Sequence, residues 1–136
     1  HNGKLWVLNA GSGYLGWVDF DKKAFVPFTF CPGFLRGLSM IGDVAAVGLS
    51  KARNGRFSGL ELDDELKKRD ADAWCGIQIV SLSTGDVLQW IRFEGDISEV
   101  FDVSFLAGVR NPMMVGLRTA EIRELITFES DMAVTA

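Results

Sequence analysis

The chain has 136 residues, 48% of them hydrophobic, and its 18 acidic and 14 basic residues give a net charge of −4. This length suits one domain with a substantial core, and the composition excludes global disorder. The acidic balance argues against nucleic acid as the main partner, and no apolar run approaches the ~20 residues that cross a bilayer.

Short β-strands separated by glycine-bearing turns dominate the chain. Runs rich in β-branched and aromatic residues predict these strands, and turns such as Gly42-Asp43 and Ser83-Thr84-Gly85-Asp86 predict tight reversals, because Gly accepts positive φ and Asp and Ser bond locally. The predicted strands are Lys4–Asn9, Tyr14–Phe20, Phe25–Phe30, Leu35–Ile41, Val44–Ser50, Gly76–Leu82, Val87–Phe93, Val100–Leu106 and Met113–Leu117.

Residues 51–74 form an insertion of a different character. The insertion opens as KARNGRFSG and continues as LELDDELKKRDADA, which predicts a short helix with acidic residues early and basic residues late, as the helix dipole favours. Asp63 or Asp64 is the predicted cap. A second helix is predicted over Thr119–Ile126, where TAEIRELI places apolar residues on one face.

An internal repeat relates the strands to one another. The matched pieces are Val18–Phe20 with Val80–Leu82, Phe28–Phe30 with Ile91–Phe93, Leu38–Gly42 with Val103–Gly108, and Val47–Ser50 with Val115–Arg118, and Leu5–Asn9 is a partial copy of the last pair. Without about 21 inserted residues the period falls near the ~40 to 45 of propeller blades. The sequence predicts an all-β, propeller-like fold of four-stranded antiparallel blades, with about two blades and extra strands; a β-sandwich is the alternative.

The central hairpin, Gly76 to Phe93, is apolar on both faces. Ile77 and Ile79 point one way, whereas Val80 and Leu82 point the other. Strands of this kind are usually covered on both faces. We therefore expect residues 1–136 to be one domain in the C-terminal part of a longer protein, completed by the remaining blades of that protein. Self-association is the other expectation, through an apolar interface of more than about 1,000 Å².

Three segments carry a resemblance: VGLSKARNGRFSGL, CGIQIVSLSTGDVLQWIRFEG and FDVSFLAGVRNPMMVGL. Together they resemble a family of uncharacterised bacterial conserved proteins, a domain of unknown function of propeller-like, WD-repeat-like type. The resemblance covers about Leu5 to Ile126. It implies a propeller-class fold and a longer parent protein, and it brings no catalytic residues.

The longer connections between strands, residues 10–13, 31–34, 51–74 and 94–99, form the expected binding end of the fold, because binding residues concentrate on loops held by a rigid frame. The candidate residues for a small anionic ligand are Arg36, Lys51, Arg53, Arg56 and Ser58. Guanidinium groups pair well with phosphate and carboxylate. The alternatives are a solvated loop whose charges match nearby acidic residues and, for Arg36, a structural pair with Asp102.

Catalytic, metal and cofactor chemistry has little support in the sequence. The only histidine is His1, so neither a Ser-His-Asp set nor a histidine-bearing zinc site can be assembled. Cys31 and Cys75 lack a metal-binding spacing and are interpreted as reduced, buried thiols, with a disulfide as the alternative. No cofactor is expected.

The sequence favours a cytoplasmic, non-catalytic ligand- or protein-binding module. One alternative is part of an enzyme that acts on a small anionic substrate at the loop end of a complete propeller. Another is an oligomerisation or scaffolding part anchored by exposed tryptophans.

Overall fold

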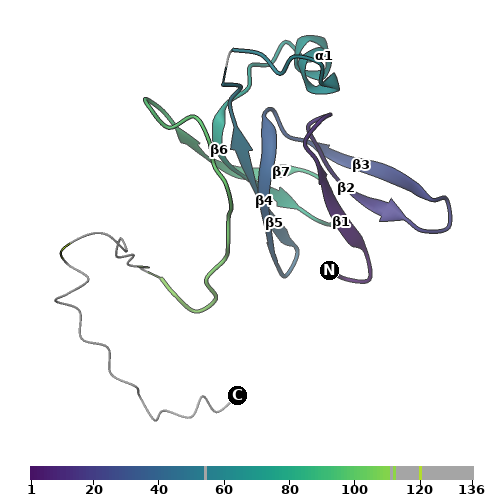
Figure 1. Ribbon diagram of the computed structural model, residues 1–136. Helices are drawn as coiled ribbons and strands as arrows, with labels where there is room; N and C mark the ends of the chain where they lie inside the picture. Colours follow the sequence, from purple (N-terminus) through teal and green to yellow (C-terminus); the bar gives the residue numbers. More distant parts are fainter. Residues whose placement is uncertain (54, 111, 113–119, 121–136) are drawn as a thin grey trace. The chain divides into compact units, whose positions relative to one another are not determined.

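The computed structural model describes residues 1–53, 55–110, 112 and 120, which divide into two units, His1–Phe105 and Leu106–Ala136. The first unit holds two antiparallel sheets and one short helix (Figure 1). The described residues of the second unit include one turn, where the Val109 amide donates to the Leu106 carbonyl at 3.3 Å. No helix among the described residues is both long and apolar enough to cross a membrane. The prediction of a mostly β chain is confirmed.

The first sheet has three strands in the order β1-β2-β3. These are β1 (Leu5–Asn9), β2 (Tyr14–Asp19) and β3 (Ala24–Phe30). Trp6 pairs with Trp17 across β1 and β2, and a register shift at Leu15/Gly16 interrupts the β2–β3 ladder. The Asp19 carboxylate accepts bonds from the amides of the following turn and so fixes the reversal into β3.

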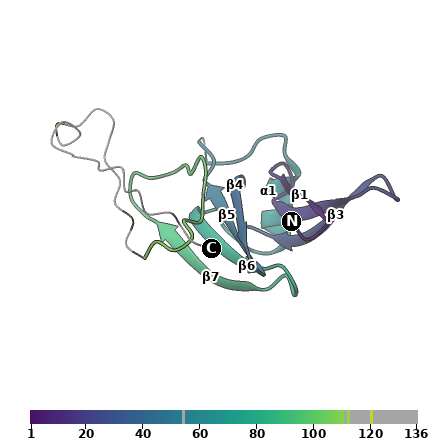
Figure 2. The same ribbon diagram turned by 90° about the horizontal axis from the view of Figure 1, so that it is seen from below.

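The second sheet has four strands in the order β4-β5-β6-β7, with β7 at its margin (Figure 2). These are β4 (Phe34–Ile41), β5 (Val44–Ser50), β6 (Cys75–Ser81) and β7 (Val87–Phe93). The predicted reversals are both present. Gly42 takes a φ of 55°, and the Asp43 carboxylate accepts bonds from the Ser81 and Ser83 hydroxyls at 3.2 and 2.7 Å, which ties the two turns together.

One hydrophobic core joins the two sheets. Leu15 of β2 belongs to the same buried cluster as Leu35 of β4, Val47 and Leu49 of β5, and Val80 of β6, and each is at most 3% exposed. Leu35 lies opposite Leu49 in the ladder, and β5 is buried along Ala45–Ser50, so this strand is covered on both faces. Cys31 and Cys75 are buried and free, as predicted.

The insertion leaves the sheet between β5 and β6 and carries helix α1 (Glu61–Lys68), as predicted. The predicted cap is wrong. The helix begins after Leu60, whose side chain makes no capping bond, and Asp63 lies inside the first turn, where its carboxylate accepts the Phe57 amide at 2.9 Å. Buried Leu62 and Leu66 pack with Phe57 in a second hydrophobic cluster.

The strand predicted over Val100–Leu106 is wrong, because no ladder forms there. Residues 98–105, called here the 98–105 segment, are held by one backbone bond, from the Lys51 amide to the Ser98 carbonyl, and by two serine side chains. The Ser50 hydroxyl bonds both the amide and the carbonyl of Val100, and the Ser39 hydroxyl accepts the Phe105 amide at 3.0 Å. The predictions over Met113–Leu117 and Thr119–Ile126 lie outside the described residues, apart from Ala120.

Strand β7 also departs from the expectation of two covered faces. Its exposed apolar residues are Val87 (44%), Leu88 (50%), Trp90 (63%) and Ile91 (54%). The strand is the last of its sheet, so within the described residues nothing pairs with its outer side.

Candidate functional site

The four longer loops meet at one end of the sheets, next to α1 (Figure 1). Backbone bonds of 2.8 to 3.1 Å join them: from the amide of Leu62 to the carbonyl of Gly11, from Cys31 to Gly13, from Trp74 to Pro32, and from Lys51 to Ser98. The expected loop end is therefore a connected surface, in which the insertion touches three other loops.

Three of the predicted site residues converge on one groove of this surface. Arg36 projects from β4, whereas Arg53 and Arg56 come from the start of the insertion, and all three line a hollow of about 270 Å³. The other lining residues are Phe34, Ser50, Ala52, Phe57, Leu60 and Glu99. We call this hollow the arginine groove.

Glu99 lies among the arginines. Arg53 donates to both of its carboxylate oxygens, from Nε at 2.5 Å and from Nη2 at 3.1 Å, and Arg36 Nη1 lies 3.8 Å away. The Glu99 side chain is 17% exposed. The bonds from Arg53 hold the pKa of Glu99 below its usual range, and the same contact raises the pKa of Arg53.

The alternative for Arg36, a structural pair with Asp102, does not form. Among the described residues Arg36 pairs with Glu99, while Asp102 is exposed and its carboxylate accepts the amide of Val103 at 2.8 Å. Sequence reasoning placed residues 94–99 at the correct end but did not identify Glu99 as the shared partner. The one sequence signal for Glu99 was its acidic side chain in the 94–99 loop, which was expected at the same end of the fold as the arginines.

Aromatic rings line the groove beside the arginines. Phe34 and Phe57 stack with centroids 6.2 Å apart and an interplanar angle of 22°. The Arg36 guanidinium lies 5.4 Å from the Phe34 ring and 5.1 Å from the Phe101 ring, which orients it through cation–π contacts. The groove thus combines apolar walls with positive groups.

A protein family matches most of this chain. The family described as Domain of unknown function (DUF4915) matches residues 1–115. The chain belongs to this family. No curated protein and no solved structure matches the chain. All lining residues of the arginine groove fall inside the DUF4915 match.

The other two predicted site residues of this DUF4915 chain lie elsewhere. Lys51 lines a neighbouring hollow of about 680 Å³ that Arg56 shares. That hollow is lined by charges of both signs, including Lys67, Asp63, Asp70 and Asp72. Ser58 is exposed and lines neither hollow. The arginine groove therefore brings together three of the five predicted site residues.

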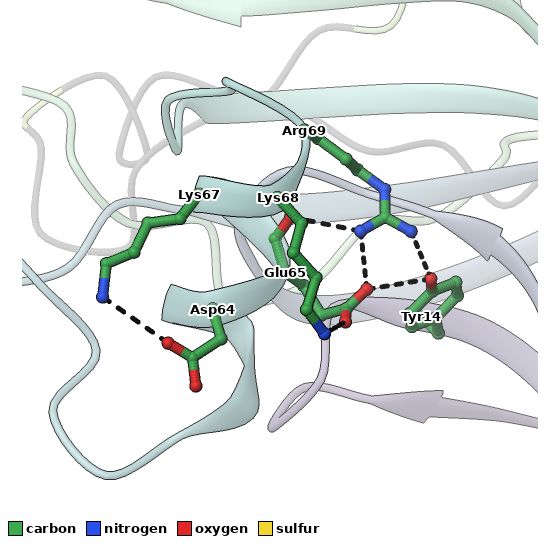
Figure 3. A network of polar contacts seen from close by, with 6 residues as sticks. All are labelled: Tyr14, Asp64, Glu65, Lys67, Lys68 and Arg69. Atoms are coloured by element: carbon green, nitrogen blue, oxygen red, sulfur yellow. Dashed lines mark hydrogen bonds and ion pairs between the residues drawn. The ribbon is translucent and has the colours of Figure 1, made fainter.

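A polar network holds α1 of the DUF4915 chain against β2 (Figure 3). The Tyr14 hydroxyl donates to Glu65 at 3.1 Å and accepts from Arg69 at 2.6 Å, and Arg69 and Lys68 both donate to the Glu65 carboxylate. The Arg69 guanidinium lies 4.3 Å from the Phe30 ring. Bonds from Lys68, Arg69 and Tyr14 lower the pKa of Glu65 to about 2.

This network ties α1 to β2, and Leu62 and Leu66 of the same helix pack with Phe57 of the groove. Sequence reasoning missed it, because Tyr14 and Glu65 are 51 positions apart. Across the described residues, no group of three or more His, Cys, Asp or Glu side chains could hold a metal ion.

Proposed function

We propose that this DUF4915 chain is a non-catalytic binding module that takes a small anionic ligand into the arginine groove. The observation that carries the proposal is the convergence of Arg36, Arg53 and Arg56 from two separate parts of the chain on one hollow. Guanidinium groups bind carboxylate and phosphate through paired, charge-assisted bonds.

The position of Glu99 supports a carboxylate as the ligand group. Glu99 supplies one negative charge to a groove lined by three guanidinium groups, which leaves two positive charges in excess. It also demonstrates that a carboxylate can sit between Arg36 and Arg53. Among the described residues Arg56 has no carboxylate partner within ion-pair distance, so it is the first arginine available to a ligand.

The walls of the groove favour a ligand with a flat apolar body next to its acid group. Phe34, Phe57 and Leu60 supply apolar contact area beside the guanidinium groups. Ligand sites of this kind combine mainly apolar walls with a few placed polar groups. An aromatic carboxylate matches both features, and benzoate is the simplest probe.

The propeller-like interpretation of the fold is consistent with a binding module. The repeat matches β1, β2 and β3 with β5, β6 and β7, and each triplet is an antiparallel meander. Each sheet would then be one blade of a WD-repeat-like propeller, and loops at one end of such blades are a common place for ligand contacts.

The test is a calorimetric or NMR titration with benzoate, with inorganic phosphate as the second probe. Arg56→Gln and Arg36→Gln should each weaken benzoate binding by about tenfold or more, the effect of losing a bond to a charged group. Lys22→Gln is the matched control, because Lys22 is exposed and pairs with Asp19 in the β2–β3 turn. Absence of saturable binding, or equal loss in the control, would contradict the proposal. Chemical turnover of the bound acid would favour the enzymatic alternative.

A further inference from the structure

We propose that the second sheet carries a stacking site for the base of a nucleotide that bears an exocyclic amino group, such as adenine. The site is a hollow of about 290 Å³ beside β7, at the margin of that sheet (Figure 2), and its lining residues are Trp74, Gln78, Val87, Trp90 and Arg92. The hollow shares no lining residue with the arginine groove, so the inference does not depend on the ligand proposed there.

The ladder between β6 and β7 places the lining residues on one face of the sheet. Gln78 lies opposite Trp90, and Arg92 shares the face of Trp90 because side chains alternate along a strand. A register shift leaves Leu88 without a ladder partner and brings Val87 onto the same face. The spacing of these side chains is therefore set by the sheet itself.

The most buried residue of the hollow is an amide whose orientation is fixed by its partners. Gln78 is 2% exposed, and its Nε2 donates to the Phe30 carbonyl and to Cys31 Sγ, both at 3.4 Å. The Cys31 thiol donates in turn to the Thr29 carbonyl at 3.8 Å, so its sulfur is an acceptor toward Gln78. Two acceptors on that side require the amide nitrogen there.

This orientation leaves Oε1 of Gln78 as a free acceptor. No donor among the described residues bonds it. Oε1 is also open to the hollow, because the only fully enclosed side-chain N or O atom without a partner in the described part of the chain is Trp6 Nε1. A nearly buried oxygen without a donor favours a ligand that brings an N–H group.

Two tryptophans give the hollow flat walls. Trp74 is 9% exposed and belongs to the main core cluster, whereas Trp90 is 63% exposed and has a ring face that a ligand can cover. Thr29 Oγ1 donates to the Gly85 carbonyl at 2.9 Å, which ties the β6–β7 turn to β3 and holds the strand that carries Trp90. Nucleotide bases of every kind stack on aromatic rings of this sort.

Arg92 supplies a cation beside the aromatic walls. Its guanidinium lies 5.3 Å from the centroid of the Trp74 ring, a cation–π contact that orients it. Among the described residues no carboxylate lies within ion-pair distance of Arg92. A guanidinium binds phosphate through paired, charge-assisted bonds, so a phosphate attached to the stacked base has a partner here.

The small number of polar groups favours a nucleotide over a sugar acid. A sugar acid would bring several hydroxyl groups into a hollow that offers one amide oxygen and one guanidinium, and buried hydroxyls without partners are costly. A base buries its flat faces and needs partners only along its edge. At about 290 Å³ the hollow is close to the lower end of the roughly 300 to 1,000 Å³ typical of small-molecule sites, which suits one ring system. The net charge of −4 favours a free nucleotide over a polynucleotide.

The primary measurement is an NMR titration of the full chain with AMP, read at the indole N–H signals of its four tryptophans. AMP should shift the signals of Trp74 and Trp90 saturably and leave those of Trp6 and Trp17, in the first sheet, unchanged. Adenosine, which lacks the phosphate, should bind at least about tenfold more weakly. The monophosphate of unsubstituted purine riboside, which lacks the amino group, should lose a similar factor. Glucuronate should not bind saturably.

Variants of the two exposed lining residues test the roles of the ring and the cation. Trp90→Ala should weaken AMP binding at least about tenfold, the effect of losing one stacked base. Arg92→Gln should weaken AMP binding by a similar factor and remove the preference for AMP over adenosine. Phe20→Ala and Arg110→Gln, an exposed aromatic residue and an exposed arginine outside the hollow, are the matched controls.

Several results would overturn the proposal. These are the absence of a saturable shift at Trp74 and Trp90, equal affinity for AMP and for the nucleotide without the amino group, equal affinity for AMP and adenosine, and tighter binding of glucuronate than of AMP. A loss of AMP binding in the control variants as large as in Trp90→Ala would do the same.

Discussion

Arg53 and Glu99 form a two-bond ion pair between residues 46 positions apart, with Nε to Oε1 at 2.5 Å and Nη2 to Oε2 at 3.1 Å. The pair joins the insertion to the 98–105 segment. The next residue of that segment, Val100, bonds the Ser50 hydroxyl at the end of β5. The arginine groove and the 98–105 segment therefore share one carboxylate.

Replacing Glu99 separates its effect on ligand binding in the arginine groove from its anchoring of the 98–105 segment. Glu99→Gln removes the internal carboxylate that competes for Arg36 and Arg53, so the affinity for benzoate should rise by up to about fivefold, the effect of one exposed ion pair. The thermal unfolding midpoint should fall, because the 98–105 segment loses an anchor. Glu94→Gln, an exposed acid of the same loop, is the control. A lower affinity in Glu99→Gln would show that Glu99 helps to bind the ligand.

The Glu65 network predicts a specific dependence of stability on pH. The pKa of Glu65 lies at about 2 in the folded chain, against an ordinary value of 4.5, so its contribution to stability is complete above 4.5 and is lost as the pH falls to about 2. The unfolding midpoints of the unmodified chain and of Glu65→Gln should differ at pH 6 and converge near pH 2. A constant difference across this range would contradict the assignment.

The two thiols should be inert in the folded chain. Burial raises the pKa of Cys31 to about 12 and also raises the pKa of Cys75, so neither forms appreciable thiolate, the reactive species, at pH 8. A thiol reagent such as Ellman's should react slowly with the native chain and rapidly with both cysteines in guanidinium chloride. Rapid native reaction of one thiol per chain would show that its site opens.

Gly13 is required by the contact between the β1–β2 loop and α1. A Cβ atom at Gly13 would lie 2.7 Å from Leu62 Cδ1 and 2.9 Å from Phe30 Cε2, at a φ of 77°. Gly13→Ala should therefore lower the free energy of unfolding by about 1 to 3 kcal/mol through overpacking, in addition to the backbone cost. Gly3 has nearly the same φ, 72°, and a Cβ atom there would have no neighbour within 4 Å. The loss of unfolding free energy in Gly3→Ala therefore measures only the cost of alanine at a positive φ. An equal loss of unfolding free energy in Gly13→Ala and Gly3→Ala, measured by urea unfolding, would show that the β1–β2 loop moves to accept the added methyl group.

Seven strands and the inserted helix could be predicted from the sequence, because the signals for them are local. Val44–Ser50 and Val87–Phe93 were predicted with the bounds that the structure has. The Gly42-Asp43 turn depends on a positive φ that glycine readily adopts. The clustering of loops at one end also follows from an antiparallel meander, which places alternate connections at the same end.

Only the tertiary structure decided which distant residues meet. Val100–Leu106 has the composition of a strand, yet it passes close over Gly37 of β4 and bonds the hydroxyls of Ser39 and Ser50 instead of a ladder. Glu99, not Asp102, became the partner of Arg36, and Tyr14 became a partner of Glu65. Composition and spacing record the preferences of neighbouring residues along the chain, whereas these contacts depend on how two sheets and an insertion pack around one core.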